Sequence, residues 1–182
     1  MSKNYDDFSI RMKQYEAFET ERRFIPLLPV YARLDGRGFS SFTRGMQRPF
    51  DLRLTAIMVE ATKYLVQHTH AKIGYTQSDE ISLIWRAGEY KESIFFDGRA
   101  MKMASVLASM CTAAFTKFLL ESDLASYAKK LPHFDGRVIS FPTETEAANM
   151  FLWRVSDATK NAISMAACRL SPLRQLSIPG GH

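Results

Sequence analysis

The stretch from Ala71 to Trp85 constrains the fold more than any other part of the chain. It reads AKIGYTQSDEISLIW, which is typical of a strand, a tight turn and a second strand. Two acidic residues, Asp79 and Glu80, stand side by side at the turn of this apolar hairpin. Carboxylate oxygens are preferred ligands of hard divalent cations, and these two add nothing to a hydrophobic core. The stretch predicts a hairpin with a metal site at its tip; a solvated acidic turn is the alternative.

The hairpin lies between two long helical patterns, and a further strand lies beyond each of them. The apolar spacing predicts helices from Asp51 to about His70 and from about Arg99 to Phe118, with Asp51 as the cap of the first. Short strands are expected at 30–34 and 137–141, and terminal helices at 5–20 and 144–168. Strand, helix, strand, strand, helix, strand is the split βαβ, or ferredoxin-like, order of an α+β domain.

Asp35 follows the first of these strands and is a second candidate metal ligand. In a split βαβ fold the first strand lies beside the hairpin, so Asp35 and Asp79 are expected to be neighbours although 44 positions (79 − 35) separate them. Paired carboxylates of this kind hold the two Mg²⁺ ions of phosphoryl-transfer sites, and Gly36 allows a close backbone approach. The alternative is a plain turn, because Asp-Gly-Arg recurs at Asp97 and Asp135, which are interpreted as turn residues.

Basic and aromatic side chains near these acids are candidates for nucleotide binding. The chain has a net charge of +5, which suits a polyanionic partner but is also common in proteins without one. Phe39 is expected either to stack on a base or to belong to the core. The candidates for binding phosphates are Arg37, Arg48, Arg99 and Lys102, of which the last two begin a helix.

Composition indicates the class of protein. With 182 residues, 46% of them hydrophobic, a single domain with a substantial core is expected. The two cysteines, Cys111 and Cys168, fall in helical patterns, which argues for a reducing compartment and against a disulfide framework or zinc site. The sequence suggests neither a membrane span nor a signal peptide, so the expected localisation is cytoplasmic.

Three motifs, taken in order, resemble one known family. They are Arg33-Leu-Asp-Gly-Arg-Gly-Phe39, Arg48-Pro-Phe-Asp51 and Gly74-Tyr-Thr-Gln-Ser-Asp-Glu80. This set is similar to the tRNA-His guanylyltransferase family and its relatives, the guanylyltransferase-like 3′–5′ RNA polymerases. Further matches extend the resemblance over roughly 33–166: Arg99 and Lys102, the stretch 134–138, and Trp153-Arg154 with Asp157 and Asn161.

The resemblance implies a catalytic domain of the palm type, like those of polymerases and nucleotide cyclases, with a core at about 28–142. Asp35, the Gly36 carbonyl and Asp79 would carry two Mg²⁺ ions, with Glu80 as a further catalytic acid. The implied nucleotide-binding residues are Gly36, Arg37, Phe39, Arg48, Asp51, Ser78, Arg99 and Lys102. The residues assigned to RNA are Arg154, Lys160 and Asn161.

The resemblance also implies an activity and partners. Enzymes of this family activate a tRNA 5′ end with ATP, or use a 5′ triphosphate, and the 3′-hydroxyl of a nucleoside triphosphate such as GTP then attacks it. The chain is thus expected to be a nucleotidyltransferase that adds nucleotides to tRNA in the 3′–5′ direction. Members usually assemble as homo-tetramers, and no membrane partner is expected.

Two departures from the family pattern bear on this hypothesis. Thr159 stands where enzymes that add an untemplated G carry a histidine, which favours the branch that repairs 5′-truncated tRNAs on a template. Residues 169–182 match nothing in the family, so a truncated or altered C-terminus stays open. The alternatives are a palm-domain nucleotide cyclase, another triphosphate-using enzyme, or a non-catalytic relative that binds nucleotide or RNA.

Overall fold

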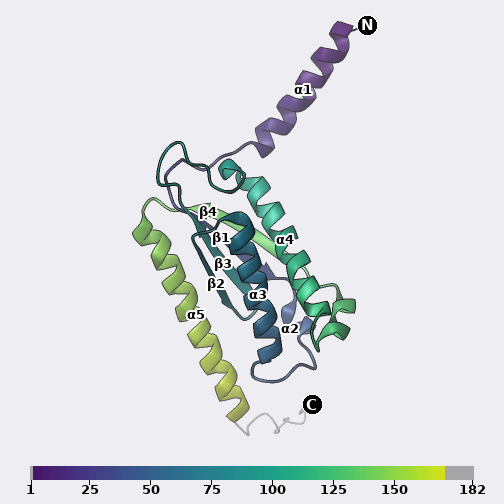
Figure 1. Ribbon diagram of the computed structural model, residues 1–182, viewed down its shortest axis with the longest axis vertical. Coiled ribbons are helices and arrows are strands. Elements are labelled where there is room, and N and C mark those ends of the chain that lie inside the picture. Colours follow the sequence, from purple (N-terminus) through teal and green to yellow (C-terminus); the bar gives the residue numbers. More distant parts are fainter. Residues whose placement is uncertain (1, 171–182) are drawn as a thin grey trace, which may run out of the picture.

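The computed structural model describes residues 2–170 and has a four-stranded antiparallel sheet at its centre (Figure 1). The strands lie in the order β2-β3-β1-β4, so β1 is paired on both sides. This is the strand order of the ferredoxin-like fold, and the predicted arrangement is confirmed. The strands are β1 Val30–Gly36, β2 Ile73–Gln77, β3 Glu80–Trp85 and β4 Phe134–Ser140.

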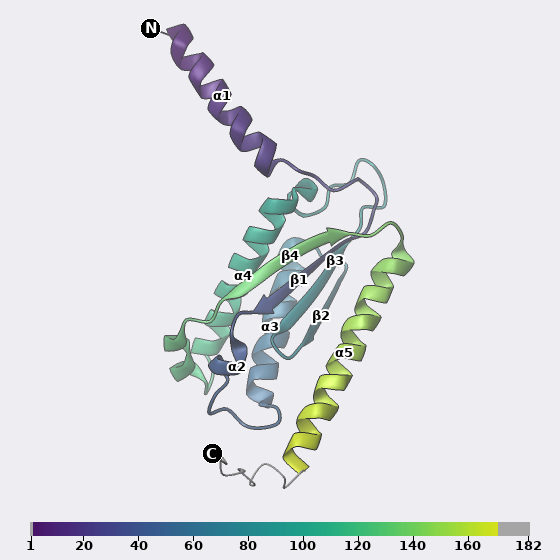
Figure 2. The same cartoon turned by 180° about the vertical axis from the view of Figure 1, so that it is seen from behind.

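Helices cover the two faces of the sheet unequally (Figures 1 and 2). Two long helices, α3 and α4, pack side by side on one face, whereas α5 runs along the other face on the side of β2 and β3. The N-terminal helix α1 projects away from the sheet as a separate rod (Figure 1). The helices are α1 Ser2–Thr20, α2 Phe39–Phe42, α3 Leu52–Thr69, α4 Ala100–Leu120 and α5 Glu144–Leu170, with short 3₁₀ turns η1 Phe95–Gly98 and η2 Ala125–Lys130.

The hydrophobic core lies between the sheet and the helix pair α3 and α4. Alternate residues of a strand face opposite sides, so one set points into this core and the other toward α5. By length and composition α4 is long and apolar enough to span a membrane. Its buried residues lie at the centre of this core, which accounts for its apolar composition. The core residues of the central strands and α4 are Val30, Ala32, Leu34, Ile81, Leu83, Trp85, Met103, Leu107, Cys111, Phe115 and Leu119.

Asp51 fixes the beginning of α3, as the sequence predicts. Its carboxylate accepts backbone hydrogen bonds from Arg53 (3.1 Å) and Gln47 (3.1 Å) and an ion pair from the Arg53 guanidinium (2.7 Å). These three interactions hold the pKa of Asp51 well below its usual range. The N-cap thus links the loop before α3 to the first turn of the helix.

The structure differs from the sequence interpretation around β4. Asp135 and Gly136, expected to lie in a loop, belong to the strand and pair with Asp35 and Leu34 of β1. Glycine is needed there because a Cβ on Gly136 would lie 2.6 Å from the carbonyl oxygen of Ala104 in α4. β1 likewise continues through Asp35 to Gly36. The expectations for residues 171–182 lie outside the described part of the chain.

We predict that Gly136→Ala destabilises the protein by about 1–3 kcal/mol, the usual cost of overpacking a core. The added methyl group would meet backbone atoms of α4, which give way only if the helix moves off β4. Chemical denaturation measures the change. Gly88→Ala is the matched control, since its nearest neighbour is the mobile end of the Glu92 side chain, 3.3 Å away. Equal midpoints for the two variants would contradict the close approach.

Candidate active site

The candidate site lies where the end of β1 meets the turn between β2 and β3. The Gly36 amide donates a hydrogen bond to the Asp79 carbonyl oxygen at 3.0 Å, and Asp35 pairs with Glu80 across the ladder. A pocket of about 580 Å³ opens at this point between the sheet and α5. Its lining residues are Arg33, Asp35, Phe50, Gln77, Ser78, Asp79, Glu80, Arg154, Ala158, Asn161, Ala162, Ser164 and Met165.

Asp35 and Asp79, the two predicted metal ligands, line this one pocket as the topology argument expects. Burial raises the pKa of Asp35, and the negative charge of Asp79 raises it further. Burial also raises the pKa of Asp79. The hydrogen bond that the Ser78 hydroxyl donates to its Oδ1 atom, at 2.9 Å, acts in the opposite direction and lowers this pKa. Two partly buried carboxylates whose pKa values are raised by burial and by neighbouring acids are suited to receive a cation.

The donor set suits Mg²⁺. Within residues 2–170 no cluster of three or more acidic, histidine or cysteine side chains is arranged as a metal site. Mg²⁺ is usually bound through one or two carboxylates, several waters and the phosphates of a substrate, rather than by an all-protein cage. Asp35 and Asp79 supply the two carboxylates, whereas Gly36, whose carbonyl is the third predicted donor, follows Asp35 in β1 and does not line the pocket. Asp135, next to Asp35 on β4, is exposed and pairs with Arg137 (3.5 Å).

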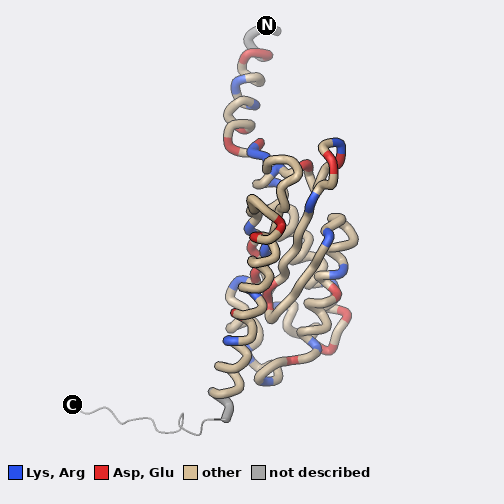
Figure 3. The backbone as a smooth tube through the Cα atoms, turned by 90° about the vertical axis from the view of Figure 1, so that its left-hand side faces the viewer, with Lys and Arg blue, Asp and Glu red and all other residues tan. Residues whose placement is uncertain are grey.

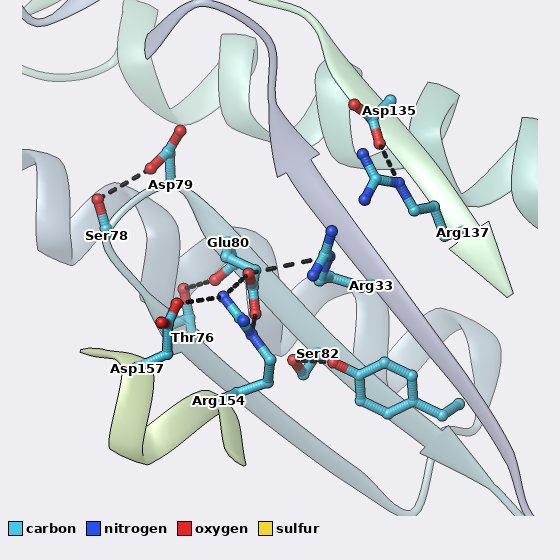
Figure 4. Close-up of polar contacts among 11 residues, drawn as sticks. Arg33, Thr76, Ser78, Asp79, Glu80, Ser82, Asp135, Arg137, Arg154 and Asp157 are labelled. Carbon is cyan, nitrogen blue, oxygen red and sulfur yellow. Dashed lines mark hydrogen bonds and ion pairs between the residues drawn. The ribbon is translucent and has the colours of Figure 1, made fainter. Parts of the chain in front are cut away.

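Glu80, which the resemblance implies as a further catalytic acid, is engaged in a salt bridge with α5 (Figure 4). Its buried carboxylate forms a two-pronged ion pair with Arg154 of α5, from Nε to Oε1 at 2.7 Å and from Nη2 to Oε2 at 2.6 Å. Asp157 lies 3.2 Å from the same guanidinium. Both oxygens of Glu80 are therefore engaged, and we interpret it as a positioning residue that holds α5 against the sheet.

The three residues predicted to bind RNA lie in different environments, and the ion pair with Glu80 accounts for that of Arg154. Arg154 is buried against Glu80, so its guanidinium is not offered to RNA in this structure. Asn161, two turns further along α5, lines the acidic pocket, as Arg154 does. Lys160 is exposed and does not line the pocket. The three residues therefore do not form one surface.

Arg33 is a functional candidate that the sequence interpretation did not single out. It lies two positions before Asp35 on the same face of β1 and lines the pocket. Its Nε atom is buried without a hydrogen-bond partner, and Glu80 Oε2 lies 3.9 Å away. A buried donor without a partner is costly, and an anionic ligand would satisfy it. Strand alternation was the available signal, since it places residues 33 and 35 side by side.

Comparison with known proteins decides the family. A family model for tRNAHis guanylyltransferase matches residues 9–142 of the chain. The chain belongs to the tRNAHis guanylyltransferase family. The enzyme named tRNA(His) guanylyltransferase of Schizosaccharomyces pombe is 30% identical over 82% of this chain. The match spans 56% of that relative's length, so the chain corresponds to little more than half of it.

Solved structures of the tRNAHis guanylyltransferase family share the fold. A bacterial tRNA(His) guanylyltransferase (Thg1)-like protein in complex with GTP superimposes with a TM-score of 0.82 and 38% identity, over 91% of this chain and 77% of that one. A second structure, of such a protein in complex with ATP, gives a TM-score of 0.83 and 40% identity, over 93% of this chain and 72% of that one. These neighbours establish the palm-like fold of the chain.

The other predicted nucleotide ligands of this family member are distributed over three places. Ser78 lines the main pocket and also a smaller adjoining one of about 100 Å³, which Arg48 and Asp51 line as well. Arg37 lies in another groove on the far side of the β1 end. Arg99 and Lys102 line neither pocket beside the acids, but a separate pocket of about 470 Å³ between α4 and α1.

Phe39 is a core residue, which is the alternative that the sequence left open. Only 4% of it is exposed, and its ring packs against three others, those of Phe42, Phe115 and Phe134, with centroids 4.7 to 5.5 Å apart. Gly36 lies against the same ring, since a Cβ there would be 2.4 Å from Phe39 Cδ2. Phe39 thus supports the backbone of the site and presents no free face to a base.

We predict that Glu80→Gln lowers the free energy of unfolding by about 3 kcal/mol, because it leaves the buried Arg154 charge with Asp157 alone. The double variant Glu80→Gln with Arg154→Met should lose less than the sum of the single changes, with a coupling energy of at least about 1 kcal/mol. Denaturant unfolding of the four proteins measures both values. Additive effects would show that the pair does not hold α5.

We predict that Asp79→Asn raises the melting temperature of the metal-free protein at neutral pH by a few degrees at most. The folded-state pKa of Asp79 is raised, so the folded protein binds this proton more tightly than the unfolded chain. Stability is therefore lost as pH rises from the ordinary aspartate pKa of about 3.9 through the folded pKa, and asparagine removes that loss.

Calorimetry from about pH 4 to pH 8 checks this prediction, and the difference between the proteins should shrink on acidification. Mg²⁺ should raise the melting temperature of the wild type more than that of Asp79→Asn, since bound metal stabilises only the folded state. A lower melting temperature of Asp79→Asn at neutral pH would show that the carboxylate is structural.

Proposed function

We propose that this chain is a Mg²⁺-dependent nucleotidyltransferase that adds nucleotides in the 3′–5′ direction to the 5′ ends of tRNA. The observation that carries the proposal is the presence of Asp35 and Asp79 in one pocket of about 580 Å³. That volume is in the range of nucleotide-sized ligands. Membership of the tRNAHis guanylyltransferase family supplies the reaction class.

Asp35, Asp79 and the Gly36 carbonyl would hold two Mg²⁺ ions at the end of β1. Bound there, the ions would neutralise the triphosphate and stabilise charge on the entering and leaving oxygens of an in-line displacement. The carboxylates would hold the ions at the end of β1, a strand that is fixed on both sides by its pairing with β3 and β4. Arg154 and Glu80 keep α5 in place as the opposite wall of the pocket.

The triphosphate would lie between the acids and Arg33, whose Nε atom has no hydrogen-bond partner, and the base in the adjoining smaller pocket. Ser78, Phe50 and Met165 line both pockets and so connect them. Arg48 and the hydroxyl groups of the smaller pocket supply polar contacts for a nucleotide. The neighbouring family structures in complex with GTP and with ATP support this use of the fold.

We also propose tRNA as the acceptor and templated repair of its 5′ end as the favoured activity. The name of the Schizosaccharomyces pombe relative supports a tRNA substrate, and Thr159 in place of the family histidine supports the repair branch. A homo-oligomer, with a tetramer favoured, is the proposed assembly. The projecting helix α1 supports it, because it exposes a set of large apolar side chains that includes Phe8, Tyr15 and Phe18.

The first experiment is incorporation of labelled GTP into a 5′-truncated tRNA with Mg²⁺ and ATP. We predict templated addition by the wild type and a loss of at least about 100-fold in Asp35→Ala and Asp79→Ala, because one carboxylate cannot hold both ions. Both variants should keep a cooperative thermal transition. Leu152→Ala, an exposed position on the outer side of α5, is the control and should keep full activity.

The alternatives give different outcomes. GTP binding without incorporation into any tRNA would contradict the proposal and favour a non-catalytic binding protein. Consumption of triphosphate without RNA, with release of a cyclic nucleotide, would favour a palm-domain cyclase.

A further inference from the structure

A second groove, lined by cations, lies beyond the end of the β1–β4 ladder and is separate from the acidic pocket. It has a volume of about 640 Å³. One wall is the turn around α2 and the other is the segment that leads from η2 into β4. We call it the basic groove; its lining residues are Arg37, Gly38, Ser41, Phe42, Arg44, Lys130, Leu131, Pro132 and His133.

The groove is positively charged and contains no acid. Arg37 and Arg44 are exposed, and neither has an ion-pair partner among the described residues. Lys130 donates hydrogen bonds to the main-chain oxygens of Phe42 (2.7 Å) and Arg44 (3.4 Å), which leaves its charge unneutralised by any carboxylate. Over much of the described chain basic and acidic positions lie interspersed along the tube (Figure 3), whereas the lining of this groove is basic only.

The two walls of the groove are tied together by hydrogen bonds. The Arg37 amide donates to the His133 carbonyl oxygen at 2.9 Å, and Lys130 crosses to the α2 turn. The Lys130 ammonium and the main chain of Arg37 are therefore held in place before any ligand arrives, which lowers the entropic cost of binding.

The lining indicates recognition of phosphate rather than of bases. Phe42 is buried, and the face of the Tyr127 ring is covered by the Lys130 ammonium, 4.6 Å from its centroid. Neither the Phe42 ring nor this face of Tyr127 is thus free to stack on a base, and His133 is an exposed ring of the lining. The guanidinium groups and the exposed Ser41 hydroxyl are donors suited to phosphodiester oxygens. This chemistry favours the backbone of a nucleic acid over a free nucleotide.

The position of the groove connects it to the proposed reaction. Its two walls continue directly from β1 and β4, and the last pair of that ladder, Gly36 with Phe134, separates the groove from Asp35 and Asp135. We propose that the basic groove binds the phosphate backbone of the RNA substrate beside the acidic pocket. This inference rests on the proposed function for the identity of the RNA, but RNA binding itself does not depend on turnover.

Binding of a 5′-truncated tRNA without nucleotide, measured over a series of salt concentrations, tests the proposal. We predict that Arg44→Glu weakens binding about 5- to 10-fold and reduces the slope of log K against log salt by about 1, as loss of one phosphate contact does. Ser41→Glu adds a negative charge and keeps the main-chain hydrogen bond of Ser41 to Gly38, and it should weaken binding similarly. Arg44→Lys should retain most of the affinity.

Lys91→Glu is the matched control, because it makes the same kind of charge reversal at an exposed position in the loop after β3. It should leave RNA affinity within about twofold of the wild type, and GTP affinity should be unchanged in Arg44→Glu. Equal losses in Arg44→Glu and Lys91→Glu would overturn the proposal, since they would reflect net charge alone.

Two other results would also overturn it. Loss of GTP affinity in Arg44→Glu with RNA binding intact would indicate that the groove binds a triphosphate. If the wild type did not bind RNA at all, the groove could not be an RNA-binding site. Failure of nucleotide incorporation with the predicted binding pattern intact would overturn only the proposed function.

Discussion

The double pairing of β1 is the constraint on which the rest of the structure depends. Its ladder with β3 places Asp35 opposite Glu80, and its ladder with β4 places Gly36 opposite Phe134. A slip of one residue in either ladder would turn Asp35 toward the hydrophobic core. Burial of the apolar set of β1, including Leu34, therefore also fixes the direction of the carboxylate. One register of β1 therefore both buries the apolar side chains that stabilise the core and sets the geometry of the acidic pocket.

Much of the fold follows from local patterns in the sequence. Alternating apolar residues identified the hairpin, the capping aspartate marked the start of α3, and the order of elements specified the sheet topology that brings Asp35 and Asp79 together. The error at Asp135 and Gly136 has a physical cause. Asp-Gly is a common turn pair, and only the close approach of α4, which no local pattern reveals, explains a glycine inside β4.

Contacts between side chains that are distant in sequence could not be predicted from local patterns. Glu80 and Arg154 are 74 positions apart, and no local pattern indicates that they form an ion pair. For Phe39 the sequence left open whether the ring stacks on a base or belongs to the core, and only its distant partners Phe42, Phe115 and Phe134 decide for the core. Arg99 and Lys102 were assigned by charge and helix position, and neither property reports which end of the sheet a helix begins at.

The two faces of the sheet have different roles: one packs the core and the other lines the acidic pocket. The face under α3 and α4 is a packed apolar interior, whereas the face under α5 carries ionisable groups, and α5 is anchored there by a charge pair and the Phe151 ring against Tyr31 and Tyr75. Beyond that anchor, α5 presents the small residues Ala158 and Ala162 to the pocket. Substitutions at these two positions would change which ligands fit without disturbing the interior, so variation in substrate choice can accumulate on α5 while the remaining architecture stays constant.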